Sequence, residues 1–328
     1  MAKNMKAAAV AAGSMALAGL LGAAAVRVQR KHCLQILRTR DGIARVHVVE
    51  AEDGEQVRAL SLGGVFQSAT YVDDRRFEPV FAYYRAFDAL FLAEPALGHP
   101  VRHVLMLGGG GFAYPKHLLT TRAGIRMDAV ELDPGIVRAA RRWFFLDELE
   151  ARLADPARAN GCALRVVVGD GRALLERAEG HVMPPAKLPA PSRLGFATDG
   201  AGGSLRPLRE GELAVPRYDA IVNDAFSGRE PVRSLATVEA ARAARSRLAP
   251  GGVYLMNVVS RDGGRDVSFL QDEVATLLRV FSHVHVLPAS DAAFGAEDNY
   301  LLVATDADTA FPEAIAYDAD FPGTPLAD

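Results

Sequence analysis

Short apolar runs alternate with segments of helical spacing from about residue 101 to residue 305, and this alternation constrains the fold more than any other feature. A continuous apolar run that ends at a glycine or an acid is typical of a parallel strand buried on both faces. Strands that alternate with helices form a parallel sheet with the helices packed on its faces. The sequence therefore predicts an α/β protein with a Rossmann-like, doubly wound sheet.

The expected elements of this sheet follow one another closely. Apolar runs predict parallel strands at residues 101–108, 126–132, 164–170, 218–224 and 252–259. Segments with helical spacing follow these strands. The first comes after the strand at 101–108 and ends at about residue 122, and the others lie at residues 134–144, 171–178, 237–252 and 268–281. Two further strands, at residues 283–288 and 299–305, close the sheet.

The residues before the sheet have a different pattern. Apolar and polar residues alternate over most of residues 34–72, and the pairs Asp53-Gly54 and Gly63-Gly64 divide the runs. Alternation with a period of two, broken by such pairs, is typical of β-hairpins, so we expect a β-meander here. Apolar residues in 77–93 then share one face of a predicted helix.

These patterns divide the chain into parts. We expect an N-terminal hydrophobic segment at residues 1–32 and a small β-rich domain with its helix at residues 33–95. A large Rossmann-like domain should follow at residues 96–309, and a tail at residues 310–328. Residues 180–216 are rich in Pro and Gly and interrupt the strand–helix alternation, so they are expected to form a loop insertion.

A segment of twenty uncharged residues, 7–26, lies near the N-terminus. Twenty helical residues at a rise of 1.5 Å just span a hydrocarbon core of about 30 Å, so a single membrane anchor is the first interpretation. Half of the segment is alanine, which weakens its tendency to insert. A cleaved signal peptide, with Ala23-Ala24-Ala25 as the cleavage site, and an Ala-rich helix or leader are the alternatives.

The composition excludes several classes of function. The chain has 37 Lys and Arg against 40 Asp and Glu, a net charge of −3, which gives it no overall attraction for nucleic acid. Its two cysteines, Cys33 and Cys162, form neither a disulfide framework nor a zinc motif. The pairs His283/His285 and His99/His103 have no carboxylate or cysteine beside them at ligand spacing. We therefore expect neither a metal nor a nucleic-acid partner.

The first strand of the large sheet ends in a run of four glycines that begins at Gly108. Gly108 and Gly110 allow a tight turn and close approach of a ligand, and Ala113 fits the third small position of the G-x-G-x-x-G/A pattern. Glu131 ends the second strand, where a carboxylate can accept hydrogen bonds from both hydroxyls of a ribose. Together these features predict a nucleoside cofactor, with NAD and S-adenosyl compounds both open.

Acidic residues also follow the next two strands, as Asp170-Gly171 and as Asp224. Because the carboxyl ends of parallel strands meet at one edge of a sheet, these residues should lie near the glycine run and Glu131. Each aspartate has a structural alternative, since an acid at this place often caps the following helix. In the functional interpretation, Asp224 deprotonates an attacking amine, or binds an ammonium group and orients it.

The order and spacing of these motifs resemble the polyamine aminopropyltransferase (spermidine synthase-like) family over residues 57–305. The resemblance is carried by the strings VRALSLGGVFQS, VLMLGGGG, VELDPGIV, VVVGDGRALL, YDAIVNDAFSG, LAPGGVYLMNVV and NYLLVAT. It implies a β-rich domain on a Rossmann-like, S-adenosylmethionine-dependent methyltransferase-like domain. It also implies decarboxylated S-adenosylmethionine as co-substrate, a small-molecule amine as acceptor, and a homodimer.

The resemblance implies roles for residues at the cofactor edge. Glu131 is similar to the family's ribose-binding acid, and Asp170 with Gly171 to its adenine-binding pair. Gly108 and Gly110 lie in the family's cofactor-binding glycine loop.

The resemblance also implies roles on the acceptor side. Asp224 is similar to the acid that helps to deprotonate the attacking amine. Gln67 and Tyr84, or the adjacent Tyr83, lie where the family places substrate-binding Gln and Tyr side chains.

Two acids of the family pattern are absent from this chain. The family's glycine loop usually reads GGGDGG, and Gly111 stands at the position of its Asp. The family's DSSDP string has a second acid where this chain has Ser227. The DAFSG form resembles a divergent, often membrane-associated branch of the family.

The leading hypothesis is a spermidine synthase-like transferase that moves an aminopropyl group from decarboxylated S-adenosylmethionine to an amine. The alternatives are a methyltransferase that uses S-adenosylmethionine itself, and a membrane-tethered adenosyl-compound-binding protein with a degenerate site. An NAD-dependent oxidoreductase has the least support, because no hydride-transfer group follows residue 220. We expect a membrane-anchored protein with a cytoplasmic catalytic domain, or alternatively a cytoplasmic protein.

Overall fold

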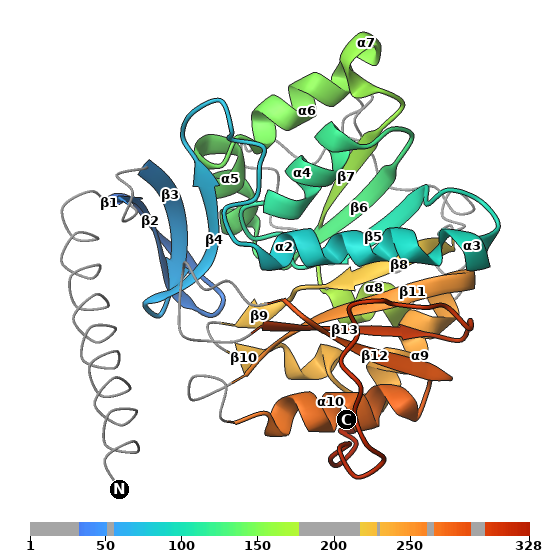
Figure 1. Ribbon diagram of the computed structural model, residues 1–328. Helices are drawn as coiled ribbons and strands as arrows, with labels where there is room; N and C mark the ends of the chain where they lie inside the picture. Colours follow the sequence, from blue (N-terminus) through green and yellow to red (C-terminus); the bar gives the residue numbers. More distant parts are fainter. Residues whose placement is uncertain (1–32, 51–55, 177–216, 228–229, 261–265, 290–298) are drawn as a thin grey trace, which may run out of the picture.

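The computed structural model describes residues 33–50, 56–176, 217–227, 230–260, 266–289 and 299–328. In this part of the chain, a four-stranded antiparallel sheet stands beside a seven-stranded mixed sheet that carries helices on both faces (Figure 1). The α/β class that the sequence predicts is therefore confirmed.

The small sheet contains β1 (Cys33–Thr39), β2 (Gly42–Glu50), β3 (Gln56–Leu62) and β4 (Val65–Tyr71), in that order. Gly63 and Gly64 join β3 to β4, and both have positive φ, 60° and 86°. A two-residue hairpin loop of this kind requires positive φ at both positions, which glycine adopts without strain. The expected β-meander is confirmed.

The small sheet packs against the large domain through one apolar face. Leu37, Val46 and Leu60 on this face are buried with Ala139 and Phe144 of the large domain. This packing holds β4 against the loop that follows the first strand of the large sheet, and so brings β4 to the candidate site.

The segment expected to form one helix over residues 77–93 is different in the structure. Residues 73–78 form turns, Pro79 pairs with Thr70 in an isolated bridge, and helix begins only at α2 (Tyr83–Ala86). The chain continues as a 3-10 helix, η1 (Phe87–Ala93), and then as α3 (Glu94–Leu97).

The winding of η1 follows from the spacing of its apolar residues. The buried residues are Tyr84, Phe87, Leu90 and Ala93, which recur every three positions. A 3-10 helix has three residues per turn, so this spacing places all four on one face. The prediction of a single helix over residues 77–93 was wrong because its face was drawn through Phe77, Val80, Phe81 and Phe91 as well, a set that matches a period of 3.6.

The large sheet has the strand order β12-β13-β11-β8-β5-β6-β7. Its strands are β5 (His103–Leu107), β6 (Arg126–Glu131), β7 (Ala163–Val168), β8 (Tyr218–Asn223), β11 (Leu248–Val259), β12 (His283–Pro288) and β13 (Asn299–Thr305). β7, β6, β5, β8 and β11 are parallel, and β13 is antiparallel to both its neighbours. The strand order reverses between β5 and β8, which is where open α/β sheets bind their ligands.

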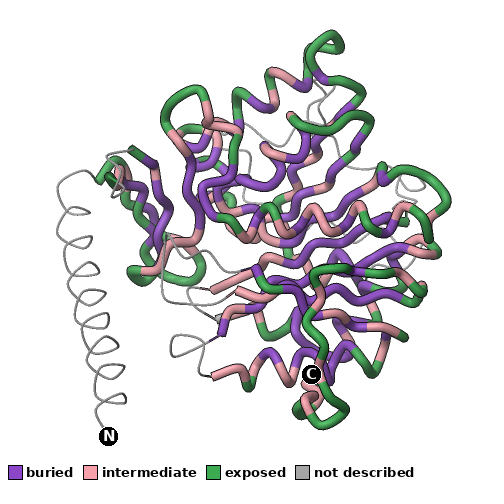
Figure 2. Tube along the Cα trace, in the orientation of Figure 1, coloured by how far each residue is buried: buried purple, intermediate pink, exposed green. Residues whose placement is uncertain are grey.

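Two apolar clusters cover the faces of this sheet, and its strands are buried along most of their length (Figure 2). One cluster includes side chains of α4 (Ala113–Thr121), α5 (Pro134–Trp143), α6 (Leu146–Ala154) and α7 (Pro156–Ala159). The other includes side chains of α8 (Gly171–Glu176), η2 (Arg233–Leu235), α9 (Val238–Arg247) and α10 (Ser268–Leu278). The burial of both faces explains the continuous apolar runs of the strands.

Several smaller features differ from the expectation, and α6 and α7, for example, have no counterpart among the predicted helices. The helix predicted to reach residue 252 ends at Arg247, because Leu248 already belongs to β11 and Pro250 cannot continue a helix. The short strands β9 (Phe226–Ser227) and β10 (Glu230–Pro231), which pair with each other, were not expected. The tail after β13 forms neither helix nor strand, but it packs on the large domain.

No helix among the described residues is long and apolar enough to cross a bilayer. The hydrophobic segment at residues 7–26 and the expected insertion at 180–216 lie outside the described residues. The anchor, its alternatives and the domain boundaries stay predictions.

Candidate functional site

The glycine loop follows β5 and lies against the end of β8. Gly108 and Gly110 have positive φ, 91° and 49°, and a Cβ on Gly108 would collide with the backbone carbonyl of Asp224. The backbone amide of Asp224 donates to the carbonyl of Leu107 at 2.9 Å. Glycine is therefore required at position 108 for the loop to approach the chain at Asp224.

Glu131, at the end of β6, holds this loop in place. One oxygen of its carboxylate accepts hydrogen bonds from the backbone amides of Gly109 and Gly110, at 3.1 and 2.9 Å. The other oxygen accepts one from the amide of Asp133, at 2.9 Å. Burial raises the pKa of Glu131, whereas the three amide donors oppose that rise.

These three hydrogen bonds limit what else Glu131 can bind. A carboxylate offers about four acceptor positions. Three are used, so a ribose with two hydroxyl donors would need one loop amide to move away or to share its acceptor. The expected ribose contact is therefore compatible with the position of Glu131, but it stays a prediction.

Asp170 and Gly171 lie after β7 at the same edge. The carboxylate of Asp170 accepts hydrogen bonds from the amides of Arg172 and Ala173, at 2.8 and 3.2 Å, which matches the capping alternative from the sequence. Asp170 is exposed, and Gly171 packs beside Leu107 of β5. Their adenine-binding role stays a prediction, since a capping acid still has acceptor positions for a ligand.

Asp224 follows β8, and two neighbouring side chains hold its carboxylate. Asn257 of β11 donates from its side-chain amide to Oδ1 at 2.8 Å, and the Tyr83 hydroxyl of α2 donates to Oδ2 at 3.4 Å. Burial raises the pKa of Asp224 to about 7, whereas the hydrogen bonds from Asn257 and Tyr83 lower it. A carboxylate with this pKa can accept a proton efficiently near neutral pH.

The structure distinguishes the two adjacent tyrosines. Tyr83 contacts Asp224, whereas Tyr84 is buried and its ring centre lies 4.2 Å from that of Tyr83. Burial raises the pKa of Tyr83 far above its ordinary value, and the charge of Asp224 adds to this effect. Tyr83 therefore remains a neutral hydrogen-bond donor, and it is the tyrosine that reaches the candidate base.

Asn257 is a site residue that the sequence analysis missed. It lies near the carboxyl end of β11, within the apolar string VYLMNVV. A single amide in a buried strand usually has a specific partner, and this is the signal that could have found it.

The β4 strand forms the side of the site opposite the sheet. The backbone carbonyl of Gln67 lies beside Gly110, and Ser68 lies against Gly111. A Cβ built on Gly111 would be 2.6 Å from the Ser68 hydroxyl oxygen and 2.9 Å from a ring carbon of Phe144. The space for a side chain at position 111 is thus filled by neighbours, so the missing acid cannot simply be added back.

A buried lysine lies behind the glycine loop. Lys116 of α4 donates from Nζ to the Thr70 hydroxyl and to the Phe144 carbonyl, both at 2.9 Å. Burial lowers the pKa of Lys116 to about 7. Because Thr70 belongs to β4 and Phe144 follows α5, this side chain joins the small sheet to the large domain.

Two other observations bear on ligands. In the part of the chain that the structure describes, no group of three His, Cys, Asp or Glu side chains could hold a metal ion. A hollow of about 550 Å³ lies at the opposite end of the sheet, where its lining includes Arg217, Arg242 and Arg245.

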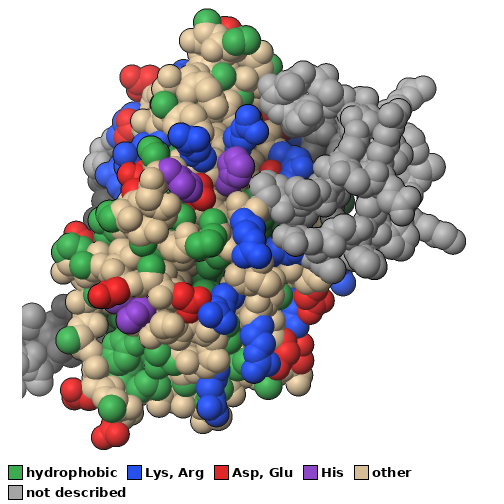
Figure 3. All heavy atoms as spheres, turned by 90° about the vertical axis from the view of Figure 1, so that its right-hand side faces the viewer, with side chains coloured by type: hydrophobic (Ala, Val, Ile, Leu, Met, Phe, Trp, Pro, Cys, Tyr) green, Lys and Arg blue, Asp and Glu red, His purple; other side chains and the backbone are tan. Residues whose placement is uncertain are grey.

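Basic side chains gather on this opposite face in Figure 3. Two arginines of the hollow are already paired, because Arg242 lies 3.5 Å from Glu239 and Arg245 lies 2.6 Å from Asp306. The positive charge that this hollow offers to an anion is therefore small.

Comparison with known proteins gives structural neighbours only. No family model matches this chain, and no curated protein matches it. A probable spermidine synthase from Corynebacterium glutamicum is similar to it with a TM-score of 0.55 and 20% identity, covering 83% of this chain and 80% of that chain.

Two further spermidine synthase structures are similar over 84% of this chain, both at 16% identity. They are the enzyme from Thermotoga maritima, with a TM-score of 0.55 over 73% of that chain, and a complex with the transition-state analogue AdoDATO, with a TM-score of 0.56 over 74% of that chain. At these identities the likeness establishes the fold, which is that of the spermidine synthases.

Proposed function

We propose that this protein is a spermidine synthase-like transferase that binds decarboxylated S-adenosylmethionine and transfers its aminopropyl group to an amine. The observation that carries the proposal is Asp224, a carboxylate with a pKa of about 7, held by Asn257 and Tyr83 beside the glycine loop. The shared fold supports it, and one structural neighbour is a complex with AdoDATO.

The proposed reaction needs only positioning and removal of one proton. The lone pair of the amine attacks the methylene carbon attached to the sulfonium, so a C–N bond forms while the C–S bond breaks. The electron pair of the C–S bond moves to sulfur, which becomes a neutral thioether, and Asp224 takes the proton released by the amine. Holding the reactants in line supplies much of the rate in such a transfer.

The residues of the cofactor edge fit an adenosyl compound. Gly108 and Gly110 bring the backbone close to the ligand position, and Glu131 retains about one acceptor position for a ribose hydroxyl. Asp170 and Gly171 would flank the adenine at the same edge. These assignments come from the resemblance together with the common location of the residues.

The acceptor should carry less charge than putrescine or spermidine. Asp224 is the one carboxylate that we place at the reacting nitrogen, since Gly111 and Ser227 replace two acids of the family pattern. A dication in a pocket with one carboxylate loses hydration without full compensation, which costs several kcal/mol. Gln67 and Tyr83 would then bind the acceptor through neutral hydrogen bonds.

Calorimetric titration of the full chain with decarboxylated S-adenosylmethionine, S-adenosylmethionine, methylthioadenosine and NAD tests the cofactor. We expect binding of the adenosyl compounds and none of NAD. Release of methylthioadenosine in the presence of an amine panel then tests the transfer. Binding of NAD alone would overturn the proposal, and turnover of putrescine at the rate of an ordinary spermidine synthase would overturn the acceptor class.

A methyltransferase that uses S-adenosylmethionine itself is the second candidate. The observation that favours it is Gly111, because the family's acid at that position would repel the carboxylate of S-adenosylmethionine. The two reactions leave different products, S-adenosylhomocysteine after methyl transfer and methylthioadenosine after aminopropyl transfer, so product analysis separates them.

The remaining predictions concern the state of the protein in the cell. A tethered adenosyl-compound-binding protein with a degenerate site would bind methylthioadenosine but release no product. Fractionation with protease protection tests the membrane anchor and the cytoplasmic catalytic domain, and sedimentation tests the homodimer.

A further inference from the structure

The C-terminal segment, residues 323–328, ends beside the turn that carries Asp170 and Gly171. The sequence predicts only a tail here, but its backbone is fixed at several points. Gly323 and Thr324 donate to Gln271 and Asp272 of α10, at 2.9 and 2.7 Å. The segment therefore lies in a defined position across the large domain.

The same segment continues onto α9. The amide of Leu326 donates to the Thr276 hydroxyl at 2.8 Å, and the carbonyl of Leu326 accepts from the amide of Val238 at 2.9 Å. The amide of Asp328 donates to Glu239 at 3.2 Å. These contacts bring the Asp328 carboxylate to the start of α9.

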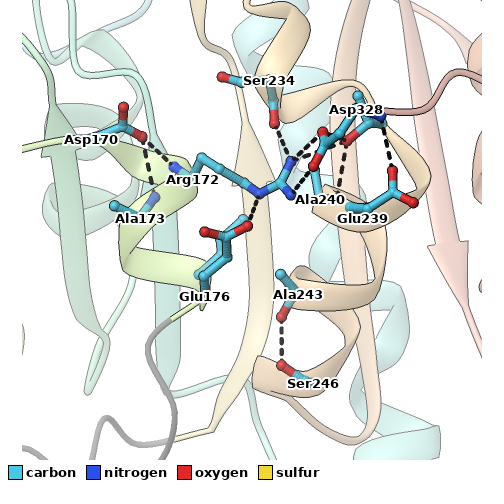
Figure 4. A network of polar contacts seen from close by, with 12 residues as sticks. Asp170, Arg172, Ala173, Glu176, Ser234, Glu239, Ala240, Ala243, Ser246 and Asp328 are labelled. Atoms are coloured by element: carbon cyan, nitrogen blue, oxygen red, sulfur yellow. Dashed lines mark hydrogen bonds and ion pairs between the residues drawn. The ribbon is translucent and has the colours of Figure 1, made fainter. Parts of the chain in front are cut away.

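There the Asp328 carboxylate meets Arg172, the second residue after Asp170 (Figure 4). Nη1 and Nη2 of Arg172 donate to this carboxylate, at 3.1 and 2.7 Å, in a bidentate pair, while Nε donates to Glu176 at 2.6 Å. The Arg172 side chain is only 12% exposed, and the backbone amide of the same residue donates to Asp170. One residue thus connects the Asp170 turn with the C-terminal segment.

Arg172 also connects the turn with the chain that follows the candidate base. Its guanidinium donates to the backbone carbonyl of Ser234 at 2.7 Å and to the Thr237 hydroxyl at 3.1 Å. Thr237 in turn donates to Asp328 at 2.8 Å. Ser234 belongs to η2, and the residue just before η2, Val232, donates from its amide to the carbonyl of Ala225, the neighbour of Asp224.

We propose that the Arg172–Asp328 pair is a positioning device of the active site. Arg172 holds the Asp170-Gly171 turn against the chain that follows Asp224, and Asp328 fixes the Arg172 guanidinium in the orientation that makes these contacts. The pair so sets the affinity for the adenosyl co-substrate. The inference rests on the proposed function for the ligand, but the positioning itself can be tested without one. A bidentate arginine–carboxylate pair suits this role because its planar geometry fixes orientation as well as distance.

We expect the protein to stay folded when the pair is removed. The Asp328 side chain is about half exposed, at 51%, so its replacement leaves no cavity in the core, and urea unfolding of the variant checks that it stays folded. Asp328→Asn removes the charge and keeps the size of the side chain, whereas Asp328→Glu keeps the charge. Asp320→Asn, at an exposed acid of the same tail, is the matched control.

The experiment measures hydrogen exchange and methylthioadenosine affinity in the full chain. In Asp328→Asn we expect faster amide exchange over residues 171–176 and 233–240, and a Kd for methylthioadenosine that is about 2- to 30-fold higher. We expect Asp328→Glu to recover most of the affinity and Asp320→Asn to match the wild type. A saturating co-substrate should restore kcat in Asp328→Asn, so the change appears in KM.

Two results would overturn the inference. One is unchanged exchange and affinity in Asp328→Asn, and the other is an equal loss in Asp320→Asn, which would indicate a general effect of charge. If the wild type binds no adenosyl compound, the proposed function fails. Hydrogen exchange then still decides whether Asp328 positions the Asp170 turn.

Discussion

At the scale of single residues, the candidate base depends on two hydrogen bonds. Asn257 and Tyr83 each donate to one oxygen of Asp224, at 2.8 and 3.4 Å, and both favour the ionised form. Burial acts in the opposite direction and is the larger effect, so the pKa lies near 7. Burial thus sets the direction of the pKa shift, and the two neighbours from other elements limit its size.

Replacing Asn257 with Leu should raise the pKa of Asp224 further. The lost hydrogen bond to a charged group is worth about 1.5–3 kcal/mol, which corresponds to about one to two pKa units. The acidic limb of the pH–rate profile should move to higher pH by that amount, and NMR titration of the carboxyl measures the same shift without turnover. Tyr83→Phe should give a smaller shift because its contact is longer, and identical profiles for wild type and Asn257→Leu would contradict this account.

Position 111 offers a second test at this scale. Gly111→Asp should destabilise the protein by about 1–3 kcal/mol, because its Cβ meets Ser68 and Phe144 in a filled space. Urea unfolding measures the loss, and the double variant Gly111→Asp with Ser68→Gly should recover part of it. A wild-type unfolding midpoint for Gly111→Asp would show that the loop can move aside, and the missing acid could then be restored directly.

At the scale of elements, α4 joins the small sheet to the large domain through Lys116. Its amine lies between the Thr70 hydroxyl of β4 and the Phe144 carbonyl after α5, and it is fully buried. Only a neutral amine, or one with compensating partners, is tolerated at such a place, which is why burial lowers its pKa to about 7.

The stability of this junction should increase with pH. The folded-state pKa of Lys116, about 7, lies below its ordinary value of 10.5, so the unfolded chain binds more protons between these limits. The free energy of unfolding therefore rises from pH 7 towards pH 10. Urea unfolding should show this rise in the wild type, and Lys116→Met should reduce it; an equal rise in both proteins would contradict the assignment.

At the scale of the whole molecule, the candidate active site should lower stability. The pKa of Asp224 is raised from 3.8 to about 7, so between these values the folded protein binds a proton that the unfolded chain has lost. The free energy of unfolding then falls as the pH rises through this window. Proteins often carry such a cost at functional sites.

Asp224→Asn should therefore remove activity and increase stability. At pH 8 we expect the variant to be about 1–3 kcal/mol more stable than the wild type, because no buried charge must form. Below pH 4 the two proteins should unfold at similar urea concentrations, which serves as the internal control. A variant that is less stable than the wild type at pH 8 would show that ionising the Asp224 carboxylate does not destabilise the folded protein.

Several parts of the fold could be predicted because their signals are local in the sequence. The apolar runs of β5 to β8 and the glycine pair between β3 and β4 each depend on residues that are close along the chain. The 3-10 winding of η1 was missed, although its spacing of three was visible. The short pair β9 and β10 was missed because two-residue strands have no periodicity.

The sequence by itself determined the α/β class and the common edge of Gly108, Glu131, Asp170 and Asp224, since both follow from the order of strands and the residues at their ends. Only the tertiary structure decided that Asn257 and Tyr83 hold Asp224, that neighbours fill the space at Gly111, and that Asp328 reaches Arg172. Tyr83 lies 141 positions from Asp224, and Arg172 lies 156 positions from Asp328. Such contacts form when packed elements bring distant segments together, and no local pattern of residue types encodes which of them will meet.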